Sequence, residues 1–260
     1  MNNLCKSSKA GAKRRIRLVI VLILILLAGF IMFQFPHLYF KKQFSYKNFV
    51  IYSNDELNKE EVLPILNIVH ANIVNSAFYQ EEQSFKLIFV GGSSYQKILH
   101  WLGVKNMAFS KYNTHIYNGY PDFKSNVLVA GTDPLELLNL EQLIAHECVH
   151  SQMYKEHSLF GFMQTPHWVN EGYSEYISYT KPRRSKAYTL TELWTTLQVD
   201  NNQWLKTSYG HYSPREYVEA LMMIEYLIET KKMTIEEIIA NDTINPYWIK
   251  KEMAIEMKNK

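Results

Sequence analysis

The stretch HECVH, residues 146–150, decides how this sequence is interpreted. Two histidines stand four residues apart, and a glutamate directly follows the first. Residues four apart on a helix share one face, with Cβ atoms about 5–6 Å apart, so His146 and His150 could bind one metal ion. Glu147 lies one position further round the helix, which suits it to accept a proton from water rather than to bind the metal. The motif therefore predicts a zinc site with a general base.

The residues around this motif predict helices. From about Pro134 to Tyr154, apolar residues recur at helical spacing, so HECVH is expected well inside a helix. A second helix is expected from about Pro166 to Tyr179. A third is expected to begin at SPRE, where Ser213 would cap the helix and Glu216 would complete a capping box.

A zinc site needs a third protein ligand. Glu171, in HWVNEGYSEYIS, is the best candidate because Glu175 follows it by one helical turn. Glu175 could accept the free N–H of a ligating histidine and so fix its tautomer. Glu156, six residues after His150, is a rival at the spacing of the metzincins, but Met153 stands where their turn glycine should be.

The combination of HECVH, WVNEG and a glutamate one turn later resembles the gluzincin metallopeptidases, the superfamily of thermolysin and the membrane-alanyl aminopeptidases. The resemblance covers roughly residues 85–227. It implies that His146, His150 and Glu171 bind one Zn²⁺ per chain and that Glu147 is the catalytic base. Glu175 would then accept a hydrogen bond from one of the ligating histidines.

A further part of the resemblance concerns YVEALMMIEYL, residues 217–227. Its layout is similar to the aminopeptidase helix that opens with a tyrosine stabilising the oxyanion, which implies this role for Tyr217. Such a hydrogen bond can contribute about 3–4 kcal/mol to lowering the barrier. His211 and Tyr209 are alternatives, since thermolysin uses a histidine, and His167 could line the mouth of the site.

Two departures from the family's pattern refine the expected activity. Twenty residues separate His150 from Glu171, slightly more than in either branch. The sequence also has no counterpart of the G-A-M-E-N element with which the aminopeptidases hold a free amino terminus, and this favours an endopeptidase. The segment 107–117 is expected to form one or two exposed strands, where an extended peptide could pair with the backbone.

The N-terminal segment has the features of a membrane anchor. Every residue from Leu18 to Phe33 is apolar or glycine, about 24 Å of helix, and six basic residues precede this run. The charge bias predicts a cytoplasmic N-terminus and places everything after Lys41 outside the cell membrane. A cleaved signal peptide is the alternative, but the run is long for one and no cleavage site follows it.

These observations predict an α+β fold: a zincin-like, two-lobed catalytic domain preceded by one transmembrane helix. The expected parts are a cytoplasmic basic tail (1–17), an anchor (18–40), a stalk (41–47) and a metallopeptidase domain (48–260). That domain would comprise an α+β lobe (48–155) with strands near 49–53, 85–91 and 126–131, followed by a helical lobe (156–260).

The sequence as a whole predicts a single-pass membrane zinc metallopeptidase, an endopeptidase acting on peptide or protein substrates. The alternatives are a non-catalytic, zinc-containing interaction module at the membrane surface, or a scaffold with accidental histidines. Glu147 argues against the first alternative, because a structural zinc site has no open position for water. The net charge of +3 is too small to indicate a nucleic-acid partner, and no disulfide is expected between Cys5 and Cys148.

Overall fold

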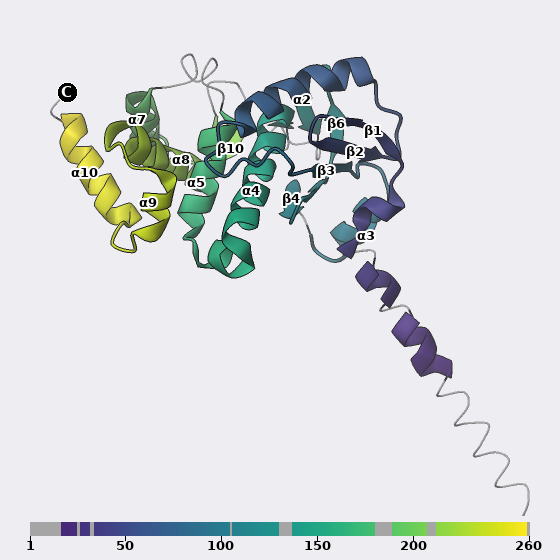
Figure 1. The fold of residues 1–260 in the computed structure, drawn as a ribbon. Coiled ribbons are helices and arrows are strands. Elements are labelled where there is room, and N and C mark those ends of the chain that lie inside the picture. The colour runs from purple at the N-terminus through teal and green to yellow at the C-terminus, as the bar shows by residue number, and fades with distance from the viewer. Residues whose placement is uncertain are drawn as a thin grey trace, which may run out of the picture. The chain divides into compact units, whose positions relative to one another are not determined.

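The computed structural model describes residues 17–24, 27–31, 34–104, 106–129, 137–179, 189–206 and 212–258 (Figure 1). The chain divides into two compact units, residues 1–42 and 43–260. The second unit contains both helices and strands and carries all the described residues of the predicted site.

The structure of the first unit differs from the predicted membrane anchor. Its described residues include 17–24 and 27–31, which are helical, and a short 3-10 helix, η1 (Pro36–Tyr39). Among the residues that the structure describes, no helix is long and apolar enough to cross a membrane, which takes about 20 apolar residues in one helix. The predicted transmembrane helix at 18–40, and the single-pass localisation that depended on it, are therefore wrong.

A five-stranded sheet forms the first part of the second unit. Its strands follow the order β1 (Lys42–Tyr46), β2 (Phe49–Ser53), β3 (Phe85–Phe89), β5 (Thr114–Tyr117) and β4 (Ala108–Lys111). Strands β2, β3 and β5 are parallel, whereas β4 pairs antiparallel with β5 and lies at the edge of the sheet. The strands predicted near 49–53 and 85–91 are confirmed, and part of the predicted stalk is strand β1.

Helix α2 (Lys59–Ile73) connects the parallel strands β2 and β3, as a parallel pair requires. The side chain of Asn58 caps its start by accepting a hydrogen bond from the Glu60 amide, and the apolar face of the helix is buried in the core. Helix α3 (Ser94–Trp101) follows β3 and begins in the same way at Ser93.

A small antiparallel sheet leads into the motif helix. It contains β6 (Tyr120–Asp122), β7 (Val127–Val129) and β8 (Leu137–Asn139), in that order. Helix α4 (Leu140–Gln164) begins directly after β8, where the side chain of Asn139 caps the Gln142 amide. The prediction that this helix starts near Pro134 is therefore wrong, because pairing with β7 draws residues 137–139 into a strand.

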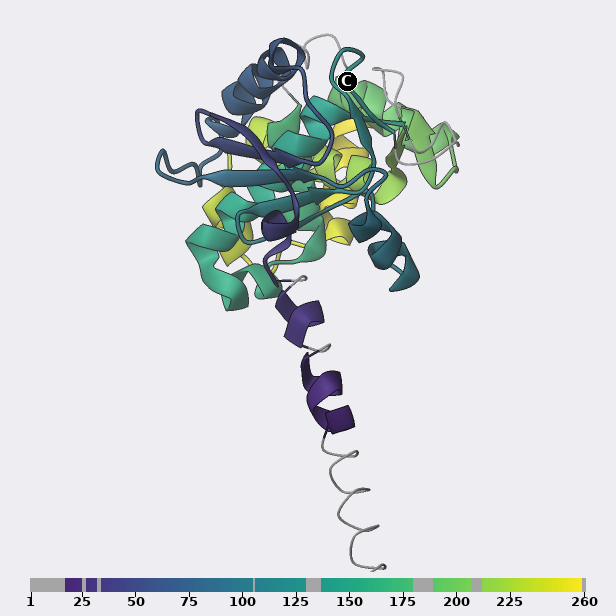
Figure 2. The same ribbon diagram turned by 90° about the vertical axis from the view of Figure 1, so that its right-hand side faces the viewer.

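Helices dominate the remainder of the chain. They are α5 (His167–Ser178), α7 (Leu190–Val199), α8 (Arg215–Glu225), the π-helical turn η3 (Tyr226–Thr230), α9 (Ile235–Ala240) and α10 (Pro246–Lys258). Figure 2 shows the sheet in front of these helices. Helix α5 packs against both α4 and α8, and Gly172 allows the close approach to α8, since a Cβ at this position would lie 2.5 Å from the Ala220 carbonyl oxygen.

The start of α8 differs from its predicted start. Ser213 belongs to β10 (Tyr212–Pro214), which pairs with β9 (Trp204–Lys206), so it does not cap the helix. The helix begins at Arg215 with no side-chain cap. Instead, the Arg215 guanidinium donates to the backbone oxygen of Leu197 at 2.6 Å, which joins α8 to α7. The predicted capping box is therefore wrong.

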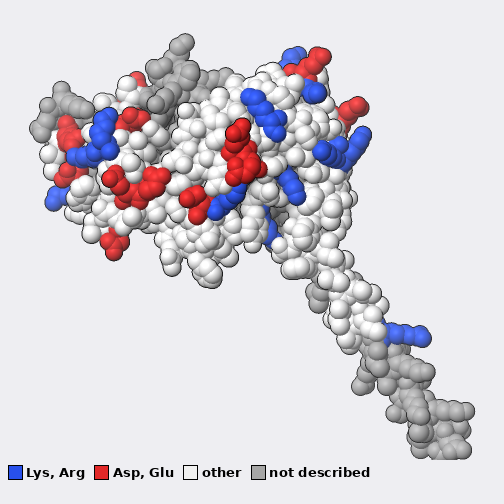
Figure 3. Space-filling view, viewed as in Figure 1, with Lys and Arg blue, Asp and Glu red and all other residues white. Residues whose placement is uncertain are grey.

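Charges of both signs are interspersed on the face of the second unit seen in Figure 3. The second unit also contains ion pairs, such as Lys231 with Glu256 and Lys250 with Glu219, each at 2.5 Å. Ion pairs near the surface typically contribute about 0–1 kcal/mol to stability.

Candidate metal centre

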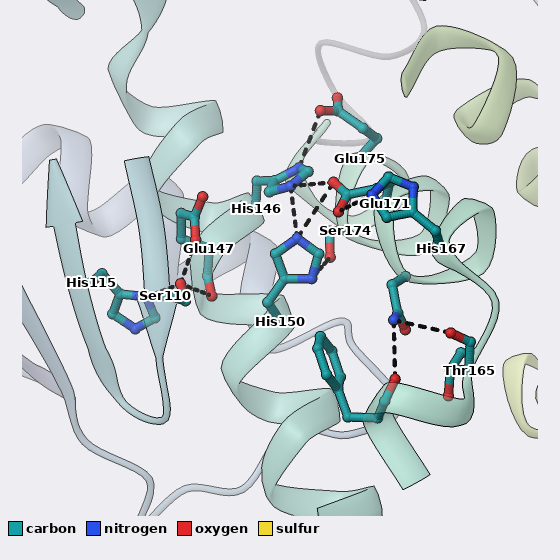
Figure 4. Close-up of polar contacts among 12 residues, drawn as sticks. Ser110, His115, His146, Glu147, His150, Thr165, His167, Glu171, Ser174 and Glu175 are labelled. Atoms are coloured by element: carbon teal, nitrogen blue, oxygen red, sulfur yellow. Dashed lines mark hydrogen bonds and ion pairs between the residues drawn. The ribbon is translucent and has the colours of Figure 1, made fainter. Parts of the chain in front are cut away.

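Two packed helices bring the predicted ligands together. HECVH lies in the regular first part of α4, well before the break in helical geometry at Ser158, and His146 is only 5 % exposed. Glu171 projects from the first turns of α5, which packs against α4. Figure 4 shows His146, His150 and Glu171 converging on one point from these two helices.

The distances among the three side chains fit a metal site. His146 Nε2 lies 2.9 Å from His150 Nε2 and 3.2 Å from Glu171 Oε2, and His150 Nε2 lies 3.5 Å from the same oxygen. Three ligands placed tetrahedrally at 2.0–2.1 Å from one ion would be about 3.3 Å apart. His146, His150 and Glu171 therefore form a group that could hold a metal ion.

The polarity of the facing atoms supports a cation at this point. Glu171 Oε2 is buried and has no hydrogen-bond partner among the described residues, although it faces two imidazole nitrogens. Buried polar atoms rarely lack a hydrogen-bond partner. Lone pairs on a carboxylate oxygen and an imidazole nitrogen repel one another unless a proton or a cation lies between them.

The electrostatics of the site also favour positive charge. Burial lowers the pKa of His146, but the carboxylates of Glu171 and Glu175 outweigh burial and raise that pKa well above its usual value. Burial alone would raise the pKa of Glu171, but its close contacts with the imidazoles of His146 and His150 reverse the effect and lower it. The excess negative charge that favours an imidazolium here would equally favour a divalent cation.

Each histidine has a polar side chain close to its other ring nitrogen. Glu175 Oε1 lies 3.1 Å from His146 Nδ1, the contact that the sequence predicts, and Gln142 Nε2 donates to Glu175 Oε2 at 2.8 Å. Ser174 Oγ lies 3.2 Å from His150 Nδ1. Such partners fix the tautomers and orientations of ligating imidazoles. Sequence reasoning missed Gln142 and Ser174, although helical spacing places them four residues before His146 and three after Glu171.

Glu147 lies beside the group without belonging to it. Its side chain is buried, and its Oε2 accepts a short hydrogen bond from the hydroxyl of Ser110 on β4. It also lines the cavity onto which the three potential ligands face. This placement, close to a metal position but outside the ligand set, is the one a general base requires.

Tyr217 is in the first turn of α8, and its ring stacks on His146 with centroids 5.7 Å apart and an interplanar angle of 13°. Burial raises the pKa of Tyr217 above its usual value, and the negative charges of Glu171, Glu175 and Glu147 raise it further. The phenol therefore keeps its proton and remains a hydrogen-bond donor beside the cavity.

The other predicted site residues have different placements. The side chain of His167 is largely exposed, and its Nε2 lies 3.5 Å from Glu171 Oε1, at the rim of the group. Glu156, the rival third ligand, is exposed and accepts a hydrogen bond from Gln80 Nε2 at 3.2 Å, away from the histidines. His211 and Tyr209 lie outside the described residues.

The group opens onto a cavity of about 600 Å³. Apolar and aromatic side chains line much of it, and the polar groups concentrate at the potential ligands and Glu147. The lining residues outside that group include Phe109, Leu138, Leu143, Phe162, Trp204 and Tyr212. Cavities of this size and composition are typical of sites that enclose a substrate.

Edge strand β4 forms one wall of this cavity. Residues 107–117 were predicted to be exposed strands, and both strands are present as β4 and β5. Strand β4 is only partly buried, but Ile116 and Tyr117 of β5 are almost fully buried, so the prediction of exposure is wrong for β5. A paired neighbour on each side buries β5 and leaves β4 at the edge.

Comparisons of the chain with known protein families, with curated proteins and with solved structures find no match.

Proposed function

We propose that the protein is a zinc-dependent metallopeptidase, an endopeptidase that hydrolyses peptide bonds in an extended substrate. One observation carries the proposal. Two histidines and a glutamate converge at ligand spacing on a cavity, with a buried glutamate beside them that is not part of the group. Three protein ligands and an open side are typical of catalytic zinc, whereas structural zinc has four protein ligands.

Zinc is the ion that suits this donor set best. Two imidazole nitrogens and one carboxylate oxygen form a ligand combination found in zinc hydrolases. Magnesium and calcium prefer sets made almost entirely of oxygen ligands. The resemblance of HECVH and WVNEG to the gluzincins implies the same metal.

The surrounding residues supply the remaining chemistry. A zinc ion held here would act as a Lewis acid that polarises the substrate carbonyl and acidifies water. Glu147 accepts a proton from the attacking water and delivers it to the leaving amine. The Tyr217 hydroxyl donates to the carbonyl oxygen as negative charge develops on it. Glu175 and Ser174 hold the two imidazoles in the tautomers that leave both Nε2 atoms free to bind the metal.

The walls of the cavity support a peptide as the substrate. Edge strand β4 lies along the cavity, and an extended peptide can add to the edge of a sheet by main-chain hydrogen bonds. A chain bound along a strand has residues on both sides of the scissile bond. This geometry supports cleavage within a chain, as does the lack of a G-A-M-E-N element in the sequence.

The test is zinc content and peptide cleavage of the purified full chain. An unbiased peptide library is incubated with wild type, with Glu147→Gln and with Glu156→Gln, an exposed control on the same helix. We expect stoichiometric zinc in all three proteins and internal cleavage by wild type and Glu156→Gln only. Cleavage that persists in Glu147→Gln would refute the mechanism. Zinc without cleavage by wild type would favour the non-catalytic module.

A further inference from the structure

A buried histidine lies behind the proposed general base, with a serine between them. Ser110 on β4 and His115 on β5 are opposite each other in the antiparallel pair. Ser110 Oγ lies 2.7 Å from His115 Nδ1, forms the short hydrogen bond to Glu147 Oε2, and lies 3.2 Å from the Glu147 backbone oxygen. Figure 4 shows Ser110 between His115 and Glu147.

The chemistry of the three groups fixes the direction of these hydrogen bonds. An ionised carboxylate only accepts, so the single hydroxyl proton of Ser110 is donated to Glu147. Ser110 Oγ must then accept from His115, which places the ring proton of His115 on Nδ1. The competing contact is the longer one: Ser151 Oγ, whose own proton goes to the Tyr112 carbonyl, could only accept from a protonated His115 Nε2, and it lies 3.4 Å away, at the limit of hydrogen bonding, against 2.7 Å for Ser110 Oγ at Nδ1.

His115 is held in its neutral form. It is fully buried, and burial lowers its pKa to about 3, with the nearby His150 adding to the effect. A neutral imidazole carries only one N–H, so it can act as a fixed donor. It also adds no positive charge behind the metal position.

We propose that His115 and Ser110 position Glu147 for proton transfer. The neutral ring orients the Ser110 hydroxyl, and the hydroxyl holds the Glu147 carboxylate in one orientation beside the cavity. The Glu147 backbone oxygen, 3.2 Å from Ser110 Oγ, gives the serine a second contact with the same residue. This inference rests on the proposed peptidase function, and it makes Ser110 and His115 positioning residues.

The first test needs no catalysis. The full chain is labelled with ¹⁵N-histidine, and the His115 ring signals are assigned by their loss in His115→Gln. We expect the ring proton on Nδ1 in wild type and in Ser110→Thr, which keeps the hydroxyl, and faster exchange of that proton in Ser110→Ala. A ring proton on Nε2 in wild type would overturn the proposal, since Ser110 would then donate to His115 and not to Glu147.

The second test separates positioning from substrate binding. Ser110→Ala should lower kcat about 10- to 100-fold, the contribution expected of one hydrogen bond to a charged group, with KM and zinc content unchanged. Ser110→Thr should recover most of kcat, and Ser94→Ala, at an exposed position on α3, should have no effect. A change confined to KM, or an unchanged kcat in Ser110→Ala, would overturn the proposal.

The two tests also separate this inference from the proposed function. If wild type cleaves no peptide, the peptidase proposal fails, but the tautomer of His115 still decides whether Ser110 connects the ring to Glu147. If wild type cleaves peptides and His115 carries its proton on Nε2, the function stands and this inference fails.

Discussion

Replacing Glu175 with alanine should weaken zinc binding without removing any ligand. Glu175 Oε1 lies 3.1 Å from His146 Nδ1, and Gln142 holds the other carboxylate oxygen at 2.8 Å. The substitution leaves His146 Nδ1 without a buried partner and frees the ring to turn. Removing such a support typically costs about 10- to 100-fold in metal affinity, or about 1.4–2.8 kcal/mol.

The assay for this prediction is competition for zinc between the full chain and a chromogenic chelator. Glu175→Gln keeps an oxygen that can accept from the ring, so its loss of affinity should be smaller than that of Glu175→Ala. Glu156→Ala, at an exposed position on the same helix as His146, serves as the control and should bind zinc like wild type. Wild-type affinity in a correctly folded Glu175→Ala protein would refute the reasoning.

Four further predictions follow from the same geometry. His150→Ala should abolish stoichiometric zinc, measured by elemental analysis, because it removes one of three ligands. Tyr217→Phe should lower kcat about 100- to 1000-fold at unchanged zinc content, since it removes only the hydroxyl donor. Gly172→Ala should destabilise the fold by about 1–3 kcal/mol in chemical unfolding, because the new Cβ would clash with the Ala220 carbonyl; full stability would contradict the packing of α5 on α8. Chelation of zinc should lower the Tm and readdition should restore it, whereas an unchanged Tm would contradict a folded-state zinc site.

The core of the candidate site could be predicted from the sequence because it depends on helical spacing. Once HECVH is on a helix, the four-residue repeat places His146 and His150 on one face. The same repeat places Glu175 one turn after Glu171. Helical spacing alone does not bring Glu171 to the two histidines; this depends on the packing of α5 on α4. The resemblance of WVNEG to the gluzincin motif was the reason to expect that packing.

The remainder of the site depends on tertiary contacts that no local pattern encodes. Ser110 and His115 come from strands more than thirty residues before Glu147 in the sequence, and neither is part of a recognisable motif. They reach Glu147 because the edge of the sheet packs against α4. Sequence reasoning could place a strand near 107–117 but could not say which side chain faced the general base.

Two predictions about the fold are wrong. Leu137 and Leu138 fit the helical period of α4, yet pairing with β7 places them in a strand, because helical spacing measures a local tendency that strand pairing can override. The run from Leu18 to Phe33 has the hydropathy of a membrane helix, yet none of the described helices is long and apolar enough to cross a membrane.

A crystal structure of the zinc-loaded full chain, with anomalous data collected at the zinc edge, would test the central claim most directly. We predict one zinc ion bound by His146 Nε2, His150 Nε2 and Glu171 Oε2, with no other protein ligand and with Glu147 facing its open side. A zinc ion bound elsewhere, or closed off by a fourth protein side chain, would contradict the claim that this is a catalytic centre.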